Sequence, residues 1–180
     1  MQRVDHIRLM ASYNAWMNDK LYEAAQCLSH EALVADKGAF FGSILGTLNH
    51  IIVGDTIWLQ RFAMHPAHYA ALDALSTSPS PQTLNQITFT DLESCSVRRK
   101  MLDDVILRWA DTIKPMDLDV TLAYVNMKGL PQHKNMFSLL MHFFNHQTHH
   151  RGQVSTLLSQ SGIELNDTDL VLLTPEQPIV

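Results

Sequence analysis

Apolar side chains recur along most of the chain at the three- and four-residue spacing of amphipathic helices. Four long stretches show this spacing, and the helices that it predicts span residues 4–28, 43–64, 90–113 and 136–160. Ser43 and Asn135 directly precede two of these stretches and belong to the residue types that cap helix N-termini well. On the first helix, Tyr13 and Trp16 are predicted to face the interior, because aromatic residues at helical spacing usually pack in a core.

The connections between the predicted helices are polar and rich in proline. Residues 65–88 contain three prolines among Ser, Thr and Ala, which predicts a long crossover loop with a helical turn near residues 67–75. Between residues 116 and 135, a β-branched and aromatic run is followed by a turn signal, and Pro131 is expected to interrupt any return strand, although the pattern allows a short irregular hairpin. The pattern therefore predicts an all-α fold, a four-helix bundle with a long crossover between its second and third helices, in a single domain over residues 1–180.

Composition and charge narrow the class of protein. A chain of 180 residues with 46% hydrophobic residues can bury a full core without disulfide bonds or structural metals. The net charge of −5, without a run of Lys or Arg, argues against a nucleic-acid or anionic-membrane partner. We expect no signal peptide and no transmembrane segment, and the widely separated Cys27 and Cys95 are expected to be free thiols. These features predict a cytoplasmic protein.

Four of the ten histidines lie within residues 142–150, on the fourth predicted helix. Side chains four positions apart on a helix are separated by about 6 Å along its axis, so two imidazoles at this spacing can bind one metal ion. The spacing occurs in His142/His146 and again in His146/His150, and it does not choose between these pairs. His149 makes a poorer pair with His146, and His142 is about 12 Å from His150 by helical rise. The alternative is a helix whose histidines face solvent or donate singly to carbonyl groups.

His50 lies within the second predicted helix, on a face that it shares with Gly54 and Ile57. This placement predicts a histidine that points into the bundle, where a hydrogen bond to a carbonyl group would satisfy it as an ordinary core residue. Bundle interiors are also where metal sites are assembled from side chains of facing helices. His50 could in that case face His146 and His150, and three imidazoles would converge.

Three segments carry a resemblance to a known family, and they read YNAWMN (13–18), SILGTLNH (43–50) and NHQTHHRGQ (145–153). With these segments the chain resembles the DinB/YfiT-like proteins over nearly its full length. The resemblance implies a divalent metal ion bound by His50, His146 and His150, with His142 and His149 outside the ligand set. It also implies a homodimer.

The resemblance further implies two functions of different class. Characterised relatives include thiol S-transferases and isomerases that depend on low-molecular-weight thiols, and others are described as metal-dependent hydrolases. We therefore expect a metal-dependent enzyme that acts on a small-molecule substrate, with a low-molecular-weight thiol as its co-substrate if it is a transferase. The alternative is a non-catalytic, metal-binding stress-response protein in which the ion cross-links the helices.

The residue types restrict the chemistry of such a site. Imidazole nitrogens suit Zn or Ni, which we expect, and also Fe or Co as alternatives. The segment lacks the glutamate of the His-Glu-x-x-His motif, in which a carboxylate accepts the proton. Gln153 can orient a ligand but cannot take a proton, and Asp55 lies about 140° around the helix from His50. The sequence thus predicts a metal site without an obvious proton acceptor, and it identifies neither a catalytic nor a substrate-binding residue.

Overall fold

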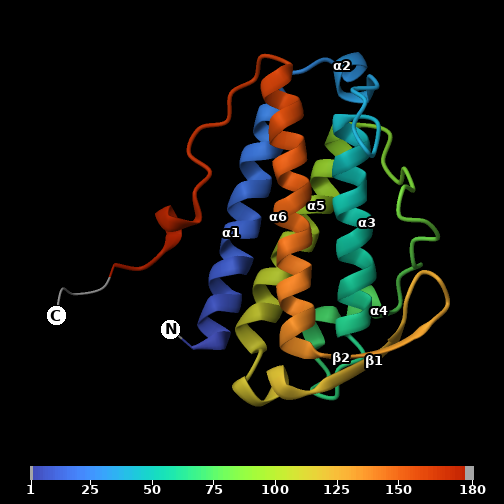
Figure 1. Ribbon diagram of the computed structural model, residues 1–180, viewed down its shortest axis with the longest axis vertical. Coiled ribbons are helices and arrows are strands. Elements are labelled where there is room, and N and C mark those ends of the chain that lie inside the picture. The colour runs from blue at the N-terminus through green and yellow to red at the C-terminus, as the bar shows by residue number, and fades with distance from the viewer. Residues whose placement is uncertain (1, 177–180) are drawn as a thin grey trace.

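Four long helices lie side by side along the longest axis of the molecule (Figure 1). They are α1 (Arg3–Ala25), α3 (Ile44–Phe62), α5 (Leu92–Thr112) and α6 (Met136–Gln160). In this computed structural model, which describes residues 2–176, α1 packs against α5 and α6, and α3 packs against the same two helices. The prediction of a mainly helical chain is confirmed, and the ends of these helices differ from the predicted ranges by at most three residues.

The side chains that face the space between the four helices are mostly apolar and fully buried. Phe62, Trp109 and Phe143 meet there from three different helices, with ring centroids 4.9 to 6.5 Å apart. Burying a side chain of this size stabilises a fold by roughly 1.5–3 kcal/mol. The interior is thus a packed core that fixes α3 and α6 as neighbours.

The prediction that Tyr13 and Trp16 face the interior is wrong. Both side chains are only half-buried, and the buried positions on this part of α1 include Asn14 and Asn18. The Tyr13 hydroxyl donates to the carbonyl oxygen of Thr168 in the C-terminal segment. Hydrophobic spacing predicted the aromatic residues on the interior face of α1. It carries no information about buried polar partners, and polar side chains occupy part of that face instead.

Short polar side chains cap the N-termini of the helices at positions that the sequence indicates. The Ser43 hydroxyl accepts the backbone N–H of Gly46, and the Asn135 side chain accepts that of Ser138. Ser29 caps the short helix α2 (His30–Val34) in the same way. These caps satisfy N–H groups that have no partner within the helix.

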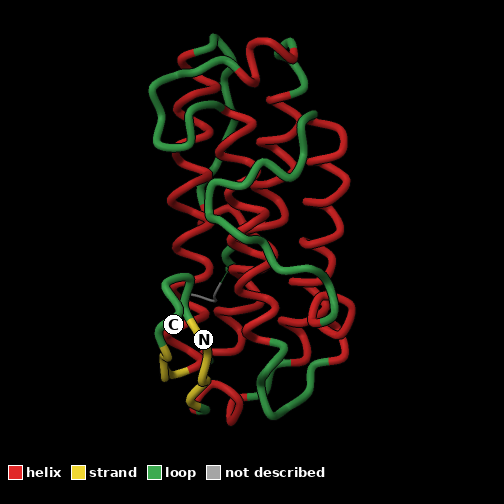
Figure 2. Tube along the Cα trace, turned by 90° about the vertical axis from the view of Figure 1, so that its right-hand side faces the viewer, coloured by secondary structure: helices red, strands yellow, loops and turns green. Residues whose placement is uncertain are grey.

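The connection between α3 and α5 is long and crosses the outside of the helices, as Figure 2 shows. Its regular elements are a 3-10 turn, η1 (Ala70–Leu72), and one helical turn, α4 (Asp73–Ser76), which together extend one residue beyond the range where a helical turn is predicted. Its second half, residues 77–91, runs as an extended loop beside α3. The backbone of this loop contacts the histidine site that is described below.

A two-stranded antiparallel sheet follows α5 and the 3-10 turn η2 (Pro115–Asp119). It pairs β1 (Thr121–Val125) with β2 (Pro131–Asn135). The expectation that Pro131 interrupts the return strand is therefore wrong. Pro131 is the first residue of β2, opposite Val125, where the missing N–H of proline is tolerated.

Residues 161–176 follow α6, and their last helical turn contacts α1. Gly162 follows α6 in the left-handed backbone conformation, with φ of 81°, and one more turn, η3 (Leu170–Leu173), comes near the end of the described residues. Within residues 2–176, no helix combines the length and the apolar character that crossing a membrane requires.

Candidate metal centre

Three imidazole rings converge between α3 and α6. His50 comes from the second turn of α3, and His146 and His150 come from successive turns of α6. The Nε2 atom of His50 lies 3.1 Å from Nε2 of His146 and 3.2 Å from Nε2 of His150. The structure thus brings together the three histidines that the sequence singles out.

Two of the three rings form a hydrogen bond through Nδ1, the ring nitrogen on the side away from the other histidines. Nδ1 of His50 lies 2.7 Å from the carbonyl oxygen of Leu84, and Nδ1 of His150 lies 2.7 Å from Oε1 of Gln153. Carbonyl and amide oxygens only accept hydrogen bonds, so Nδ1 carries the proton in both rings. The lone pair of each ring is then on Nε2, the atom that points toward the other histidines.

Burial favours the neutral form of these histidines. It lowers the pKa of His50 and of His150. It lowers the pKa of His146 further, to about 3, and neighbouring His150 adds to this shift. A metal ion binds the neutral ring, so burial keeps these side chains in the protonation state that a ligand needs.

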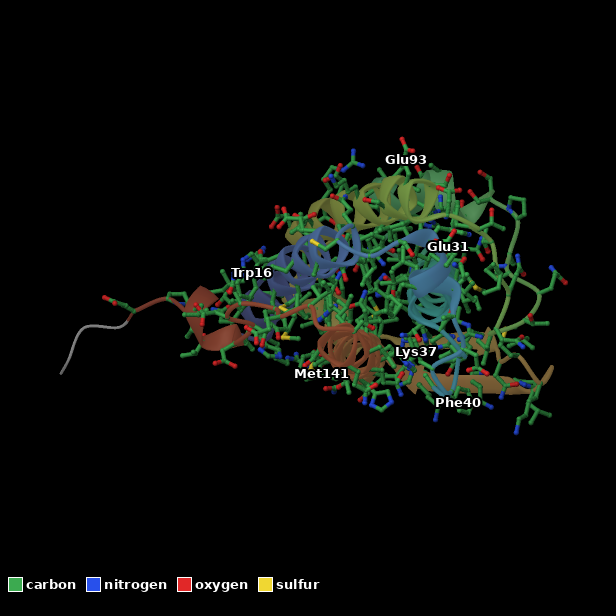
Figure 3. All side chains as sticks on the ribbon, turned by 90° about the horizontal axis from the view of Figure 1, so that it is seen from above. Trp16, Glu31, Lys37, Phe40, Glu93 and Met141 are labelled. Carbon is green, nitrogen blue, oxygen red and sulfur yellow. The ribbon has the colours of Figure 1, made fainter. Side chains whose placement is uncertain are left out.

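Phe41 covers the site from the loop between α2 and α3. Its ring stacks on that of His50, with centroids 3.7 Å apart and an angle of 16° between the planes, and it meets His150 edge-on. Seen from above in Figure 3, the neighbouring Phe40 and Lys37 lie on the side where α3 and α6 meet. The loop therefore narrows access to the histidines from one side.

The donor set could hold one metal ion. In a tetrahedral site with metal–nitrogen bonds of 2.0–2.1 Å, ligand nitrogens lie about 3.3 Å apart. The distances of 3.1 and 3.2 Å from His50 come close to this value, and all three donor atoms lie within 4.8 Å of one another. At least two of the three Nε2 atoms bear a lone pair and no proton. Without an ion, these atoms would face one another with too few protons to form hydrogen bonds among them.

The chain is similar to known proteins over most of its length. The family model described as DinB family matches residues 1–178. The chain belongs to the DinB family. It is similar to the protein DinB of Bacillus subtilis (strain 168), with 25% identity over 162 residues that cover 87% of each chain. No solved structure matched the chain.

The two other histidines of α6 lie outside the cluster in this DinB-family chain. His142 is exposed at the rim and packs edge-on against Trp58, with ring centroids 5.0 Å apart. His149 is exposed as well, and its Nε2 accepts from the amide of Gln153 at 3.3 Å. His149 thus supports the residue that orients His150, and His142 packs against Trp58 beside the cluster.

Leu84, Phe41 and Gly54 contribute to the site, although the sequence pattern did not reveal their roles. Leu84 acts through its backbone, which leaves no signature in a side-chain pattern. Phe41 lies in a loop, where hydrophobic periodicity gives no direction. Gly54 allows the His146 ring to lie directly against α3. The only signal of these roles in the sequence was the glycine that follows His50 by one helical turn.

Asp55 is turned away from the histidines and into a buried charge network. Its Oδ2 accepts from Arg99 at 2.5 Å and from the side chain of Gln147 at 2.9 Å. Arg99 also pairs with Asp103, which accepts from Asn18. Burial raises the pKa of both carboxyls, that of Asp103 to about 6, against the opposing effect of Arg99.

A second arginine completes the network. Arg151 of α6 is buried and donates to the side chain of Asn14 on α1. Two arginines and two aspartates thus balance each other's charge between α1, α3, α5 and α6. The network joins these helices behind the histidine cluster and contributes no ligand atom to it.

Proposed function

We propose that this protein binds one divalent metal ion through the Nε2 atoms of His50, His146 and His150 and uses it in enzyme chemistry on a thiol. The observation that carries the proposal is the orientation of the rings. His50 and His150 donate backwards from Nδ1, so their Nε2 lone pairs point toward Nε2 of His146, and the three atoms lie within 4.8 Å of one another. We further infer that the four long helices form the four-helix bundle expected for the family, with residues 63–91 as its crossover.

Zinc or nickel is the ion that we propose, with iron or cobalt as alternatives. Neutral imidazole is a good ligand for all four, and the site offers no thiolate or carboxylate that would select another metal. Three neutral ligands leave the full charge of the ion in place and leave room for a further ligand. When bound, the ion would favour the deprotonated form of a thiol or a water molecule in that open position.

The surroundings of the histidines favour a thiol over water as the reacting group. Hydrolysis by an activated water usually employs a carboxylate as proton acceptor. The described residues place only histidines in the cluster, and the nearby Asp55 is occupied by Arg99 and Gln147. A thiol loses its proton far more readily than water, so it needs no such base. Thiol S-transfer is therefore the reaction class that we propose, with hydrolysis second.

A purely structural ion is the competing role, because ligands from both α3 and α6 would be cross-linked by it. Cobalt substitution separates the two roles. The visible spectrum of the Co-loaded protein is recorded during titration with 2-mercaptoethanol, and thermal melting is measured with and without EDTA. The H146A variant, which loses one ligand, serves as the control.

The enzyme proposal expects a new sulfur-to-cobalt charge-transfer band in the wild-type protein and none in H146A. Chelation should also lower the melting temperature, because an ion that binds only the folded chain stabilises it. A spectrum that ignores the thiol, together with a large loss of melting temperature on chelation, would support the structural role instead.

A further inference from the structure

The crossover loop, α3 and α5 surround a cavity of about 730 Å³, which we refer to as the crossover cavity. Its walls are mostly apolar and include Ile52 and Val53 of α3, Pro81 and Phe89 of the loop, and Met101 of α5. Figure 2 shows the loop as it runs along the outside of the helices. The volume lies within the range of roughly 300–1,000 Å³ that is usual for small-molecule sites.

The crossover cavity and the histidine cluster lie on different sides of α3. Ile52 and Thr56, which line the cavity, are on a different face of the helix from His50. In Figure 3, Glu93 at the edge of the cavity lies across the molecule from Phe40, which is next to the histidine cluster. The cavity is therefore a separate site and not a part of the metal centre.

Arg98 of α5 brings a positive charge into this apolar cavity. Its side chain is half-buried, and within residues 2–176 it forms no ion pair with an acidic side chain. Its guanidinium donates one hydrogen bond there, to the hydroxyl of Thr56 at 3.4 Å. A guanidinium has five N–H donors, so most of those of Arg98 are available to a ligand.

The surroundings of Arg98 favour an anion beside it. Burial and the neighbouring Arg99 lower the pKa of Arg98. The charge of Arg99 is balanced by Asp55 and Asp103, which pair with it on the far side from the cavity lining. Glu93 also lines the cavity, but it is exposed and forms no ion pair with Arg98. A partly desolvated cation is costly, and an acid group in the cavity would offset that cost.

We propose that the crossover cavity binds a small carboxylic acid with an apolar body, whose carboxylate pairs with Arg98. The apolar walls would bury the body, and a guanidinium binds a carboxylate through two parallel hydrogen bonds. A single arginine among apolar walls favours the single charge of a carboxylate over the greater charge of a phosphate. This site goes beyond the proposed function, because it includes no metal ligand.

A solvent-filled space beneath the loop is the alternative. In that case an apolar acid would bind no more tightly than its uncharged amide, and enlarging a side chain of the wall would change nothing. Octanoate and octanamide are suitable probes, because they share the same apolar chain and differ in the charge of the head group.

The first measurement follows the methyl group of Met101 by NMR in metal-free protein labelled with ¹³C-methyl methionine. The resonance is identified by its absence in M101L, and octanoate is added stepwise. A saturable shift is expected for Met101 and none for Met116, which is 74% exposed and lies outside the cavity. Equal, unsaturable shifts of both resonances would overturn the site.

The second measurement tests the role of Arg98 with both probes. Wild-type protein should bind octanoate about tenfold more tightly than octanamide, the size of effect expected for a hydrogen-bonded charge pair. R98Q should bind both equally, and R98K should restore part of the preference. R108Q, which removes an exposed arginine of the same helix, should behave as wild type. Equal binding of acid and amide by wild-type protein would refute the pairing with Arg98.

A third measurement locates the bound probe. Val97 lines the cavity and is 66% exposed, so the larger side chain of V97W enters the cavity from its edge without disturbing the core. V97W should keep the melting temperature of wild type, since surface changes cost little, and should lose affinity for both probes. Unchanged binding of octanoate by V97W would place the probe elsewhere on the protein.

The loop that covers the cavity also contacts the metal centre. The buried side chain of Asn49 accepts the backbone N–H groups of Thr88 and Phe89, at 2.9 Å each. A few residues earlier, the carbonyl oxygen of Leu84 accepts from Nδ1 of His50. An acid bound beneath the loop would hold this carbonyl in place, and ligands that share such an element affect each other's affinity by the same factor.

Octanoate is therefore expected to raise the affinity for zinc about fivefold or more, a consequence that rests on the proposed function of the histidines. Competition with a chromophoric chelator measures the affinity with and without octanoate, and V97W controls for binding of zinc by the acid itself. An equal zinc affinity with and without octanoate would refute the link between the sites. The first three measurements use metal-free protein, so they decide on the acid site even if the proposed metal function fails.

Discussion

A methyl group added to Gly54 would lie 2.8 Å from Cε1 of His146, closer than side-chain carbons approach one another. Gly54 of α3 is thus the surface against which the His146 ring of α6 rests. The absence of a side chain at this position lets the ring lie close to α3, where its Nε2 comes within 3.1 Å of that of His50. The position of this metal-ligand candidate depends on a residue that has no side-chain chemistry of its own.

Replacing Gly54 with alanine is expected to weaken metal binding without unfolding the protein. The imidazole must shift by several tenths of an ångström, and such changes next to a ligand typically cost 10–100-fold in metal affinity. The helix itself gains from alanine by up to about 1 kcal/mol, which offsets the strain. Competitive titration with a chromophoric chelator measures the affinity, and urea unfolding of the metal-free protein measures the stability.

Gly152 of α6 provides the matched control for this substitution. A Cβ added there meets no atom within 4 Å, so G152A should gain helix stability and keep its metal affinity. Equal metal affinity in G54A and wild-type protein would show that the position of His146 does not depend on Gly54.

Much of this arrangement can be predicted from the sequence, because long amphipathic helices show a regular spacing of apolar residues. Ser43 and Asn135 cap the helices as their chemistry predicts, and the spacing of His146 and His150 places both on one face of α6. Spacing alone did not separate His146/His150 from His142/His146. The family resemblance supplied that choice, and the structure shows its physical basis, since His142 lies one turn too far along α6 and contacts Trp58.

Contacts that depend on tertiary packing could not be read in the same way. The carbonyl of Leu84 meets His50 only because the crossover loop runs beside α3. Arg99 occupies the buried stripe of α5, where a hydrophobic pattern expects an apolar side chain, because Asp55 and Asp103 reach it from both sides. Periodicity reports which face of a helix is buried, and it does not report which polar groups neutralise each other there.

The buried charge network predicts a large effect of neutralising Asp55. In D55N, only the carboxylate of Asp103 still compensates the charge of Arg99. Removing one partner of a buried ion pair typically costs about 3–5 kcal/mol. The free energy of unfolding from urea titration should fall by that amount. The metal affinity of the folded variant should change little, because Asp55 faces away from the histidines.

The exposed Asp104 offers a control of the same chemistry, and D104N should lie within about 0.5 kcal/mol of wild type. A loss below about 1 kcal/mol in D55N would mean that the pair with Arg99 adds little to stability. A large loss of metal affinity in folded D55N would place the carboxylate closer to the metal than the structure does.

The stability of the metal-free protein is expected to fall as the pH drops below about 6.5. Burial lowers the pKa of His146 to about 3 and also lowers the pKa of His50 and of His150, whereas unfolded histidines titrate near 6.5. The unfolded chain therefore takes up protons first, and stability present above pH 6.5 is lost progressively toward the folded pKa values. Each such histidine contributes a slope of at most about 1.4 kcal/mol per pH unit.

Comparison with H146Q isolates one of these histidines. Asp103, whose pKa is raised to about 6 by burial, contributes in the opposite direction, because its folded form takes up a proton more readily than the unfolded one. Asp103 is present in both proteins, so its effect cancels in the difference. Urea unfolding in EDTA between pH 7.5 and 5 should give H146Q a slope shallower by about 1 kcal/mol per pH unit, and identical slopes would refute the shift assigned to His146.

The ligand set itself predicts which histidines metal binding depends on. Replacing His50, His146 or His150 by alanine removes one of three nitrogen donors, and the affinity should fall by more than the 10–100-fold typical of a residue that only supports a ligand. Dialysis followed by elemental analysis, together with chelator competition, measures the loss. The effect should be similar for the three variants, because each ring supplies one donor atom.

His142 and His149 are the matched comparisons, since they lie on the same helix and carry the same side chain. H142A should leave the metal affinity within a few-fold of wild type, because this ring contacts Trp58 and supplies no ligand. H149A should have a small effect through Gln153, which orients His150. If H142A lost as much metal as H146A, the ion would be bound by the other pair of α6 at i and i+4. His50 would then be a core histidine satisfied by Leu84, and H50A would retain its metal.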